Sequence, residues 1–240
     1  MEKQTADREE LYKKVVPPGD PIPCNIDNPP VDDAAPTDAA LRGFVKRARY
    51  GRAGHHDGMR AEDLKTWLAG VKDKEENGTE GAGDRWRIFV QLVQSIWVTG
   101  HIPQQMLQMV IIRILKGGGD YRGIGLQNPI WKIIEVAMDD RLKILELHDC
   151  LHGFTARRGC STAIMEAKLA QLLAFLEQAP LYEIFIDLRK AFDAMDRERC
   201  LKILKDRGVG KNIRRLIWMF WELCIMACRA GGFYGGTFKA

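Results

Sequence analysis

The sequence predicts an α+β fold that is rich in helices and contains an incomplete sheet. Apolar residues recur at helical spacing through much of the 240-residue chain, and two short apolar runs, 109–116 and 183–188, fit strands. A hydrophobic content of 46% with only 10 prolines is sufficient for a packed core and argues against wholesale disorder.

The chain is expected to begin with an acidic, proline-rich, disordered leader over residues 1–40. Residues 15–36 hold seven of the ten prolines, and proline removes amide donors and prevents regular structure. Asp32 and Asp33 are expected to be simply solvated charges. The leader has a net charge of −5, which leaves +9 on residues 41–240 and favours a polyanionic partner.

A helical region is expected over residues 41–108. Thr37 fits an N-cap at the first helix, and Gly100 fits the C′ position after the third. The expected helices cover 37–50, 60–72 and 85–99, with a glycine-rich break at 51–58 and a polar loop at 72–84.

The rest of the chain alternates strands and helices. The run 109–116 is expected to pair with 121–126 as a hairpin, and Pro129 fits the N1 position of a long helix. The remaining expected elements are a basic loop over 152–162, a helix over 163–178 capped by Ser161 or Thr162, a buried strand over 183–188, helices over 196–206 and 211–226, and the start of a strand or turn over 229–240.

The segment FIDLRKAFDAMDR, residues 185–197, carries the clearest chemical signal. Asp187 lies at the end of an apolar strand, followed by basic residues and an aromatic. Polymerase palms hold divalent metal with an aspartate placed in this way, because hard cations prefer oxygen ligands. The same pattern also fits a strand end whose aspartate caps the next turn.

This segment is similar to the first catalytic motif of reverse transcriptases, especially those of non-LTR retroelements and group II introns. GRAGHHDGMRAEDL (51–64), LKGGGDYRGIGL (115–126) and HGFTARRGCSTAI (152–164) resemble three further family segments, in the family's order. The resemblance covers residues 41–240. It implies fingers over 109–181 and the first part of a palm over 182–240.

The resemblance also assigns roles to residues. Asp187 and the carbonyl of Leu188 would bind Mg²⁺ or Mn²⁺, and Phe192 would exclude a 2′-hydroxyl. The residues implied to hold the triphosphate are Lys116 and Arg122, and those implied to contact template or primer backbone are Arg157, Arg158 and Lys190. The implied partners are an RNA template, a DNA primer and deoxynucleotides.

The chain departs from the family in two ways. Gly123 replaces the proline that usually follows the fingers arginine, and the second aspartate motif is absent within the 53 residues after Asp187. AMDD, residues 137–140, precedes Asp187 and fits a helix. We therefore expect a fingers and half-palm fragment that lacks the rest of the palm and the thumb and is inactive alone. An intron maturase, an RNA polymerase relative and a non-enzymatic nucleic-acid-binding remnant are the alternatives.

The other sequence signals favour an intracellular protein without a membrane span. The start MEKQTADREE has no apolar signal region, and no uncharged apolar run approaches the ~20 residues that a span needs. Cys224 and Cys228 lie four residues apart in an apolar stretch with helical spacing, and their side chains are expected to pack in the hydrophobic core. The pairs His55–His56 and His148–His152 lack a third ligand for a metal.

Overall fold

The computed structural model describes residues 30–48, 51, 54–55, 58–69, 82–115, 118, 121–145, 147–188, 191–192, 194–230 and 233–239. Within these residues the α+β fold is confirmed, with seven α-helices and a four-stranded mixed sheet. The helices are α2 (Asp38–Arg47), α3 (Ala61–Ala69), α4 (Ala82–Thr99), α5 (Pro129–Leu142), α6 (Cys160–Leu176), α7 (Arg197–Asp206) and α8 (Lys211–Leu223), with a 3₁₀ turn η1 (Gln104–Leu107). The strands are β1 (Gln108–Leu115), β2 (Tyr121–Leu126), β3 (Ile225–Ala230) and β4 (Phe233–Lys239).

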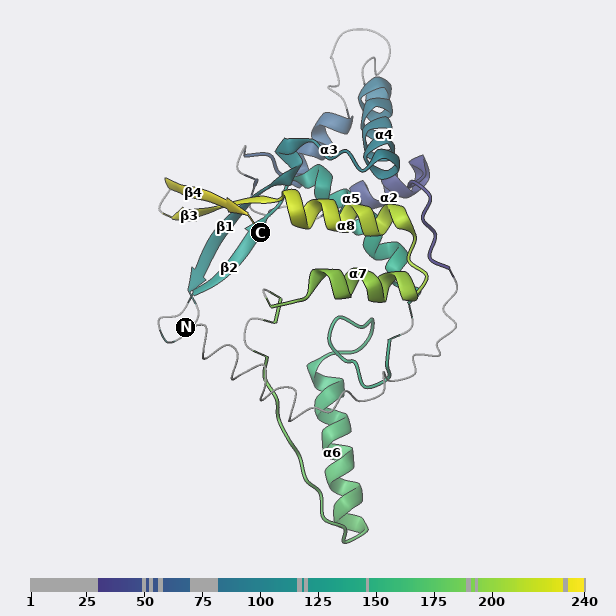
Figure 1. The fold of residues 1–240 in the computed structure, drawn as a ribbon, viewed down its shortest axis with the longest axis vertical. Coiled ribbons are helices and arrows are strands. Elements are labelled where there is room, and N and C mark those ends of the chain that lie inside the picture. The colour runs from purple at the N-terminus through teal and green to yellow at the C-terminus, as the bar shows by residue number, and fades with distance from the viewer. Residues whose placement is uncertain are drawn as a thin grey trace.

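The hydrophobic core lies among the helices. α2, α4, α5 and α8 each contribute fully buried side chains, which include Leu41, Trp97, Ile134 and Leu216. The rings of Trp131 on α5 and Phe220 on α8 stack with their centroids 4.7 Å apart and an interplanar angle of 5°. Figure 1 shows this helical body with the strands extending from one side of it.

Local signals place the ends of several helices as expected. Thr37 Oγ1 accepts a hydrogen bond from the Ala40 amide at the start of α2, and Pro129 opens α5. Gly100 follows α4 with φ +75°, and a Cβ there would lie 2.6 Å from the Arg215 Nε. The left-handed backbone conformation therefore favours glycine at this position, and any other residue would also displace the Arg215 side chain.

Arg215 joins the end of α4 to α8. Its guanidinium donates to the carbonyls of Trp97 and Val98, at 3.1 and 2.6 Å. Carbonyls in the last turn of a helix lack partners and carry partial negative charge, so a cation stabilises them.

The residues before α2 differ from the disordered leader expected for residues 1–40. The Asp33 carboxylate accepts hydrogen bonds from the amides of Asn212 and Ile213, at 2.9 and 3.0 Å. The Asp33 carbonyl accepts from Trp97 Nε1 at 3.0 Å, and Val31 is buried. The expectation that Asp33 is solvated is therefore wrong, because its side chain caps the N-terminus of α8.

The sheet has the order β2-β1-β3-β4. β1 pairs antiparallel with β2 and parallel with β3, and β3 pairs antiparallel with β4. The expected hairpin of 109–116 with 121–126 is confirmed. The end of the chain differs from expectation: residues 225 and 226 belong to β3 instead of a helix, and the tail forms a complete hairpin of β3 with β4.

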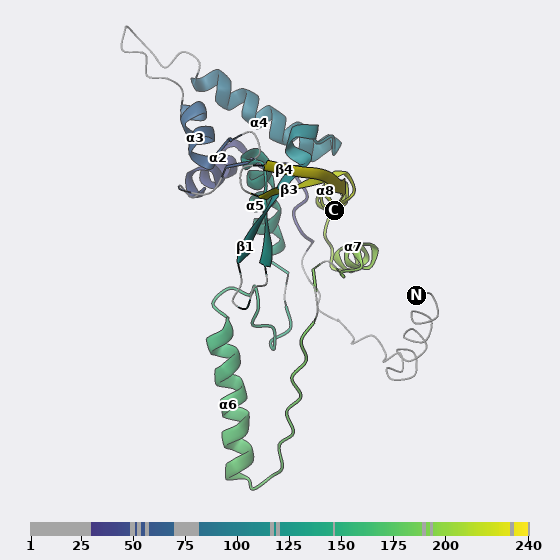
Figure 2. The ribbon, with the colours of Figure 1, turned by 90° about the vertical axis from the view of Figure 1, so that its left-hand side faces the viewer.

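α6 and the segment after it extend away from the body as an arm, defined as residues 160–188 (Figure 2). No residue of α6 is buried. Residues 181–188 are exposed and make no strand, so the expected buried strand over 183–188 is wrong. β1 and β3 already pair with each other in the sheet, and an apolar run without a neighbouring strand has no partner for its backbone groups.

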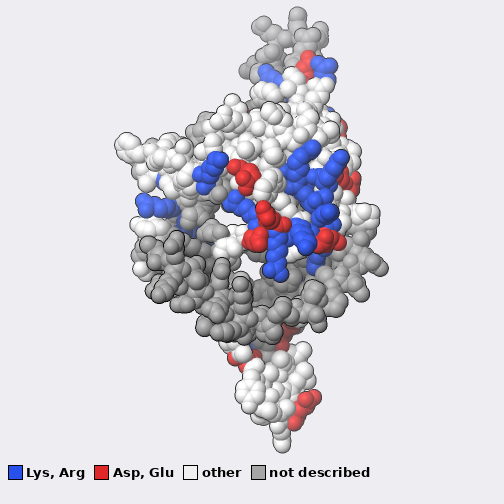
Figure 3. All heavy atoms as spheres, in the orientation of Figure 1, with Lys and Arg blue, Asp and Glu red and all other residues white. Residues whose placement is uncertain are grey.

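α7 and α8 form an antiparallel pair on one side of the body. On the face of the molecule drawn in Figure 3, Lys and Arg side chains gather over α7 and the N-terminal half of α8. This concentration of charge was not anticipated from the sequence.

The Asp33 cap leads to a test with two neighbouring aspartates. Asp33→Asn should lower the free energy of unfolding by about 1–2 kcal/mol, because the amide keeps only one acceptor oxygen for two backbone donors. Asp32 is 69% exposed and lies 3.7 Å from Arg141 Nε, so Asp32→Asn should cost under about 0.5 kcal/mol. Urea unfolding followed by tryptophan fluorescence measures both, and equal effects would contradict the cap.

The cysteines at the α8–β3 junction provide a second test. Burial, helped by the charge of Glu135, raises the pKa of the Cys224 thiol to about 11, whereas Cys228 is exposed. Core packing is thus confirmed for Cys224 and wrong for Cys228. The nucleophile is the thiolate, so iodoacetamide at pH 8 should label Cys228 and leave Cys224 unmodified.

The same shift fixes a pH dependence. The unfolded Cys224 thiol loses its proton near pH 9 and the folded one near 11, so its contribution to stability should fall over this window. Peptide mass spectrometry measures the labelling of each cysteine. The stability effect is measured by comparing the free energy of unfolding of the unmodified chain with that of Cys224→Ala between pH 9 and pH 11. Equal labelling of the two cysteines at pH 8 would refute the burial argument.

Candidate functional site

The segment that carries Asp187 is exposed in this structure. Ile184, Phe185 and Ile186 are 85%, 88% and 82% exposed, and Leu188 is 72% exposed. Asp187 itself is exposed and is not on a strand. The alternative, in which Asp187 caps the next turn, concerns residues 189–190, which lie outside the described residues. The next helix, α7, is capped by Asp196, which accepts from the Arg199 amide.

Phe192 lies near the loop that precedes α6. It is 79% exposed, and its ring meets that of Phe154 edge-on with centroids 6.3 Å apart. The structure thus brings Phe192 together with the basic 152–162 segment. Lys190 lies outside the described residues.

The β1–β2 hairpin presents Arg122 to solvent. Arg122 is opposite Ile114, and Arg113 is opposite Gly123. Successive strand residues point to opposite faces, so Arg113 and Arg122 lie on different faces of the hairpin. Arg113 lies 5.1 Å from the centre of the Tyr121 ring. Lys116 lies outside the described residues.

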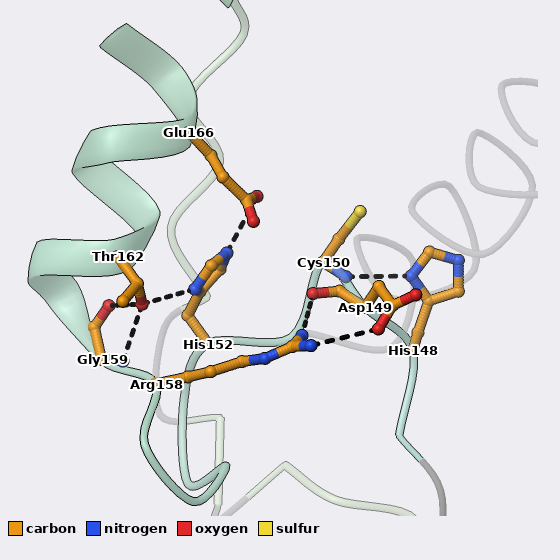
Figure 4. A network of polar contacts seen from close by, with 8 residues as sticks. All are labelled: His148, Asp149, Cys150, His152, Arg158, Gly159, Thr162 and Glu166. Atoms are coloured by element: carbon orange, nitrogen blue, oxygen red, sulfur yellow. Dashed lines mark hydrogen bonds and ion pairs between the residues drawn. The ribbon is translucent and has the colours of Figure 1, made fainter. Parts of the chain in front are cut away.

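Arg158 takes part in a local network of polar contacts within the loop before α6 (Figure 4). Its guanidinium contacts the Asp149 carbonyl and lies 3.1 Å from the Asp149 Oδ1. The His148 Nδ1 accepts from the Cys150 amide at 3.2 Å in the same turn. The positive charge of Arg158 is therefore directed at Asp149.

His152 joins this loop to α6. Its Nδ1 lies 2.7 Å from Thr162 Oγ1, and its Nε2 lies 3.0 Å from Glu166 Oε2. Thr162 donates its single hydroxyl hydrogen to the Gly159 carbonyl at 2.8 Å. These contacts hold the imidazole between the first turn of α6 and Glu166, which lies one turn further along the helix. α6 begins at Cys160, three residues before the expected start, with Gly159 at its N-cap. The expected cap by Ser161 or Thr162 is therefore wrong: both lie in the first turn, and Thr162, at N3, accepts from the Gly159 amide at 3.0 Å.

Arg157 is the arginine of this loop that faces solvent. It is exposed with φ +63°, and in the part of the chain that the structure describes it has no ion-pair partner. Figure 1 shows the free end of the β1–β2 hairpin and the 148–159 loop apart from each other, the loop lying below α7. Arg122, which lies on this hairpin, is therefore separated from Arg157 and Arg158.

Other candidate residues serve the fold. Asp139 and Asp140 lie on α5, as expected, and pair with Lys143 at 3.2 and 3.4 Å; these contacts raise the pKa of Lys143, and the Asp139 contact contributes most. His55 is buried with its Nε2 2.7 Å from the Gln108 carbonyl, which anchors residues 54–55 at the start of β1.

A pocket of about 370 Å³ lies between α2, α3 and α5. Its walls are apolar, with Phe44, Leu64 and Ile133 among them, and Arg47, Arg60 and Lys132 also line it. Two of these cations face carboxylates, Arg60 at 3.8 Å from Glu62 and Lys132 at 2.7 Å from Glu135. Of the sequence-predicted site residues that the structure describes, none lines this pocket.

Comparison with known proteins does not assign the chain to a family. No protein-family model matches the chain, and no curated protein matches it. Of the helices that the structure describes, none combines the length and the hydropathy needed to cross a lipid bilayer.

The paired arginine makes a local prediction. Arg158→Ala should speed amide hydrogen exchange in residues 149–162 by about fivefold, because the partly exposed contacts to Asp149 contribute about 1 kcal/mol. Arg157→Ala also removes one positive charge, but Arg157 has no ion-pair partner among the described residues, so this variant should leave the exchange rate unchanged. The measurement is exchange followed by mass spectrometry, and faster exchange in both variants would contradict the pairing.

Proposed function

We propose that this chain supplies the fingers and the first palm strand of a reverse transcriptase, a template-directed nucleotidyltransferase that makes DNA on RNA. The observation that carries the proposal is the β1–β2 hairpin, on which the fingers-like sequence Y-R-G-I-G-L forms β2 in regular register with β1. The proposal combines this hairpin with the order of the motifs around it.

Arg122 has the chemistry and exposure that the proposed role needs. It is exposed on β2, and its planar guanidinium matches phosphate oxygens in pairs. Arg113, on the other face, lies over Tyr121. The hairpin therefore offers one arginine to a triphosphate, whereas the other lies over the Tyr121 ring on the opposite face.

The exposed 183–188 run supports a palm strand that acts only with neighbouring strands. A soluble domain rarely leaves several consecutive large apolar residues in water, and such patches mark surfaces that become covered. The covering strands of a palm would pair with this run and bury its apolar side chains. Asp187, at the end of the run, would then be fixed at a sheet edge.

The residues present do not fit a pair of catalytic Mg²⁺ or Mn²⁺ ions. Within residues 185–197 the resemblance assigns metal binding to the side chain of Asp187 alone. The described residues contain no group of three or more His, Cys, Asp or Glu side chains placed to hold a metal. Two ions are clamped by several carboxylates together. We therefore derive no catalytic step for this chain alone, and we propose that it extends no primer by itself.

Nucleotide binding tests the proposal with two arginines on one hairpin. Arg122→Ala should weaken binding of a deoxynucleoside triphosphate by about tenfold, equivalent to about 1.4 kcal/mol for a lost charge-assisted contact. Arg113→Ala should change the affinity by less than about twofold, a small fraction of that free energy. Equilibrium titration with dTTP and Mg²⁺ gives both dissociation constants.

Two outcomes would overturn the proposal. One is the absence of measurable dTTP binding by the unmodified chain. The other is an equal loss of affinity in the two variants, which would mean that the hairpin contributes only general positive charge.

A further inference from the structure

The positive charge of the chain is concentrated in one helical pair. Residues 197–215 contain eight Lys and Arg and two Asp and Glu side chains, a net charge of +6. They therefore hold six of the nine net positive charges on residues 41–240. Figure 3 shows Lys and Arg side chains gathered on one face over α7 and the start of α8, with a few Asp and Glu side chains among them.

Several exposed cations elsewhere on the described helices are paired with a carboxylate nearby in sequence. Arg42, Arg87 and Lys143 each lie within 3.4 Å of an aspartate three or four residues away. On α7 and α8 the exposed Arg199, Lys202, Lys205 and Lys211 have no such partner among the residues that the structure describes. Their charge is therefore available to a ligand.

Three further arginines of α7 and α8 bond to neutral groups. Arg197 donates to the Trp221 carbonyl at 3.2 Å, and Arg214 donates to the Val209 carbonyl at 2.9 Å. Arg215 donates to the end of α4. Carbonyls hold the guanidinium groups without cancelling their charge, so these residues add to the positive potential of a rigid surface.

The spacing of the exposed cations on α7 places them on one side of that helix. Arg199, Lys202 and Lys205 are three residues apart and cover one side of α7 over a length of about 9 Å. Trp218 lies two turns beyond Lys211 and is only partly buried, so it shares a helix face with Lys211.

We infer that this surface, which we call the α7–α8 face and define by Arg199, Lys202, Lys205, Lys211 and Trp218, binds single-stranded nucleic acid. Unpaired cations at regular spacing on α7, together with Lys211 and a partly buried indole on α8, supply the groups that follow a phosphate backbone and stack a base. The inference goes beyond the proposed function, because it needs neither Asp187 nor Arg122. It also differs from the family resemblance, which directs backbone contacts to Arg157, Arg158 and Lys190.

The test compares two triple variants with equal loss of charge. One is Lys202→Gln, Lys205→Gln and Lys211→Gln on the α7–α8 face. The other is Lys46→Gln, Lys168→Gln and Lys239→Gln, at exposed positions on α2, α6 and β4. Glutamine keeps the length of the side chain, and circular dichroism checks that both variants retain the helical content of the unmodified chain.

Binding of a 20-nucleotide oligouridylate is measured by filter retention over a range of salt concentrations. Each phosphate contact on a single strand contributes about 0.7 to the log–log salt slope, so the α7–α8 variant should lower the slope by about two and weaken binding at least tenfold at low salt. The control variant should keep the affinity and slope of the unmodified chain. Trp218→Ala should weaken binding without changing the slope.

Three results would overturn the inference. Equal losses in the two triple variants would show a dependence on net charge alone. Unchanged binding in the α7–α8 variant would place the contacts elsewhere. A third result is that the chain does not bind oligouridylate but binds phosphatidylserine vesicles, and that this vesicle binding is lost in the α7–α8 variant. That result would identify a lipid surface as the ligand instead. Loss of dTTP affinity in Arg122→Ala is measured separately, so the two proposals can fail independently.

Discussion

The bond between the Asp33 carboxylate and the first amides of α8 is the contact on which the arrangement of the body depends. It joins residues 180 positions apart in the sequence. The Asp33 carbonyl meets Trp97 on α4, and Arg141 of α5 donates to the Ala34 carbonyl at 3.0 Å. An irregular segment of a few residues thus holds three helices that the chain itself connects only through long loops. The acidic side chain also suits its place, because a helix N-terminus carries partial positive charge.

Local features of the sequence were sufficient for most of the elements. Thr37, Pro129 and the glycines around 100 and 117–119 mark ends of helices and a turn by their own chemistry, and the helices α2–α5 and the β1–β2 hairpin followed from them. The strand expected over 183–188 failed for a different reason. Its apolar composition fits a buried strand, but a strand also needs a neighbour for its hydrogen bonds, and composition does not reveal whether one is present.

The roles assigned to single residues were harder to anticipate. Asp33 has no local sign of being a cap, because the helix that it caps lies at the other end of the chain. Arg157 and Arg158 are adjacent and equally basic in sequence, yet Asp149 pairs with only Arg158. The basic α7–α8 face is not evident from the net charge of +9 over residues 41–240. Six of these nine charges lie within the 19 residues 197–215, so only a short window along the sequence reveals the concentration.

The parallel pairing of β1 with β3 has a consequence for the order of assembly. Residues 108–112 pair with 225–229, so roughly a hundred residues of intervening chain must be synthesised before this contact can close, and closing such a long loop is entropically slow. The α2–α5 helices and the β1–β2 hairpin can form earlier, from shorter-range contacts. Until β3 arrives, one edge of β1 is unpaired, and this edge is the part of a nascent chain most exposed to association with other strands.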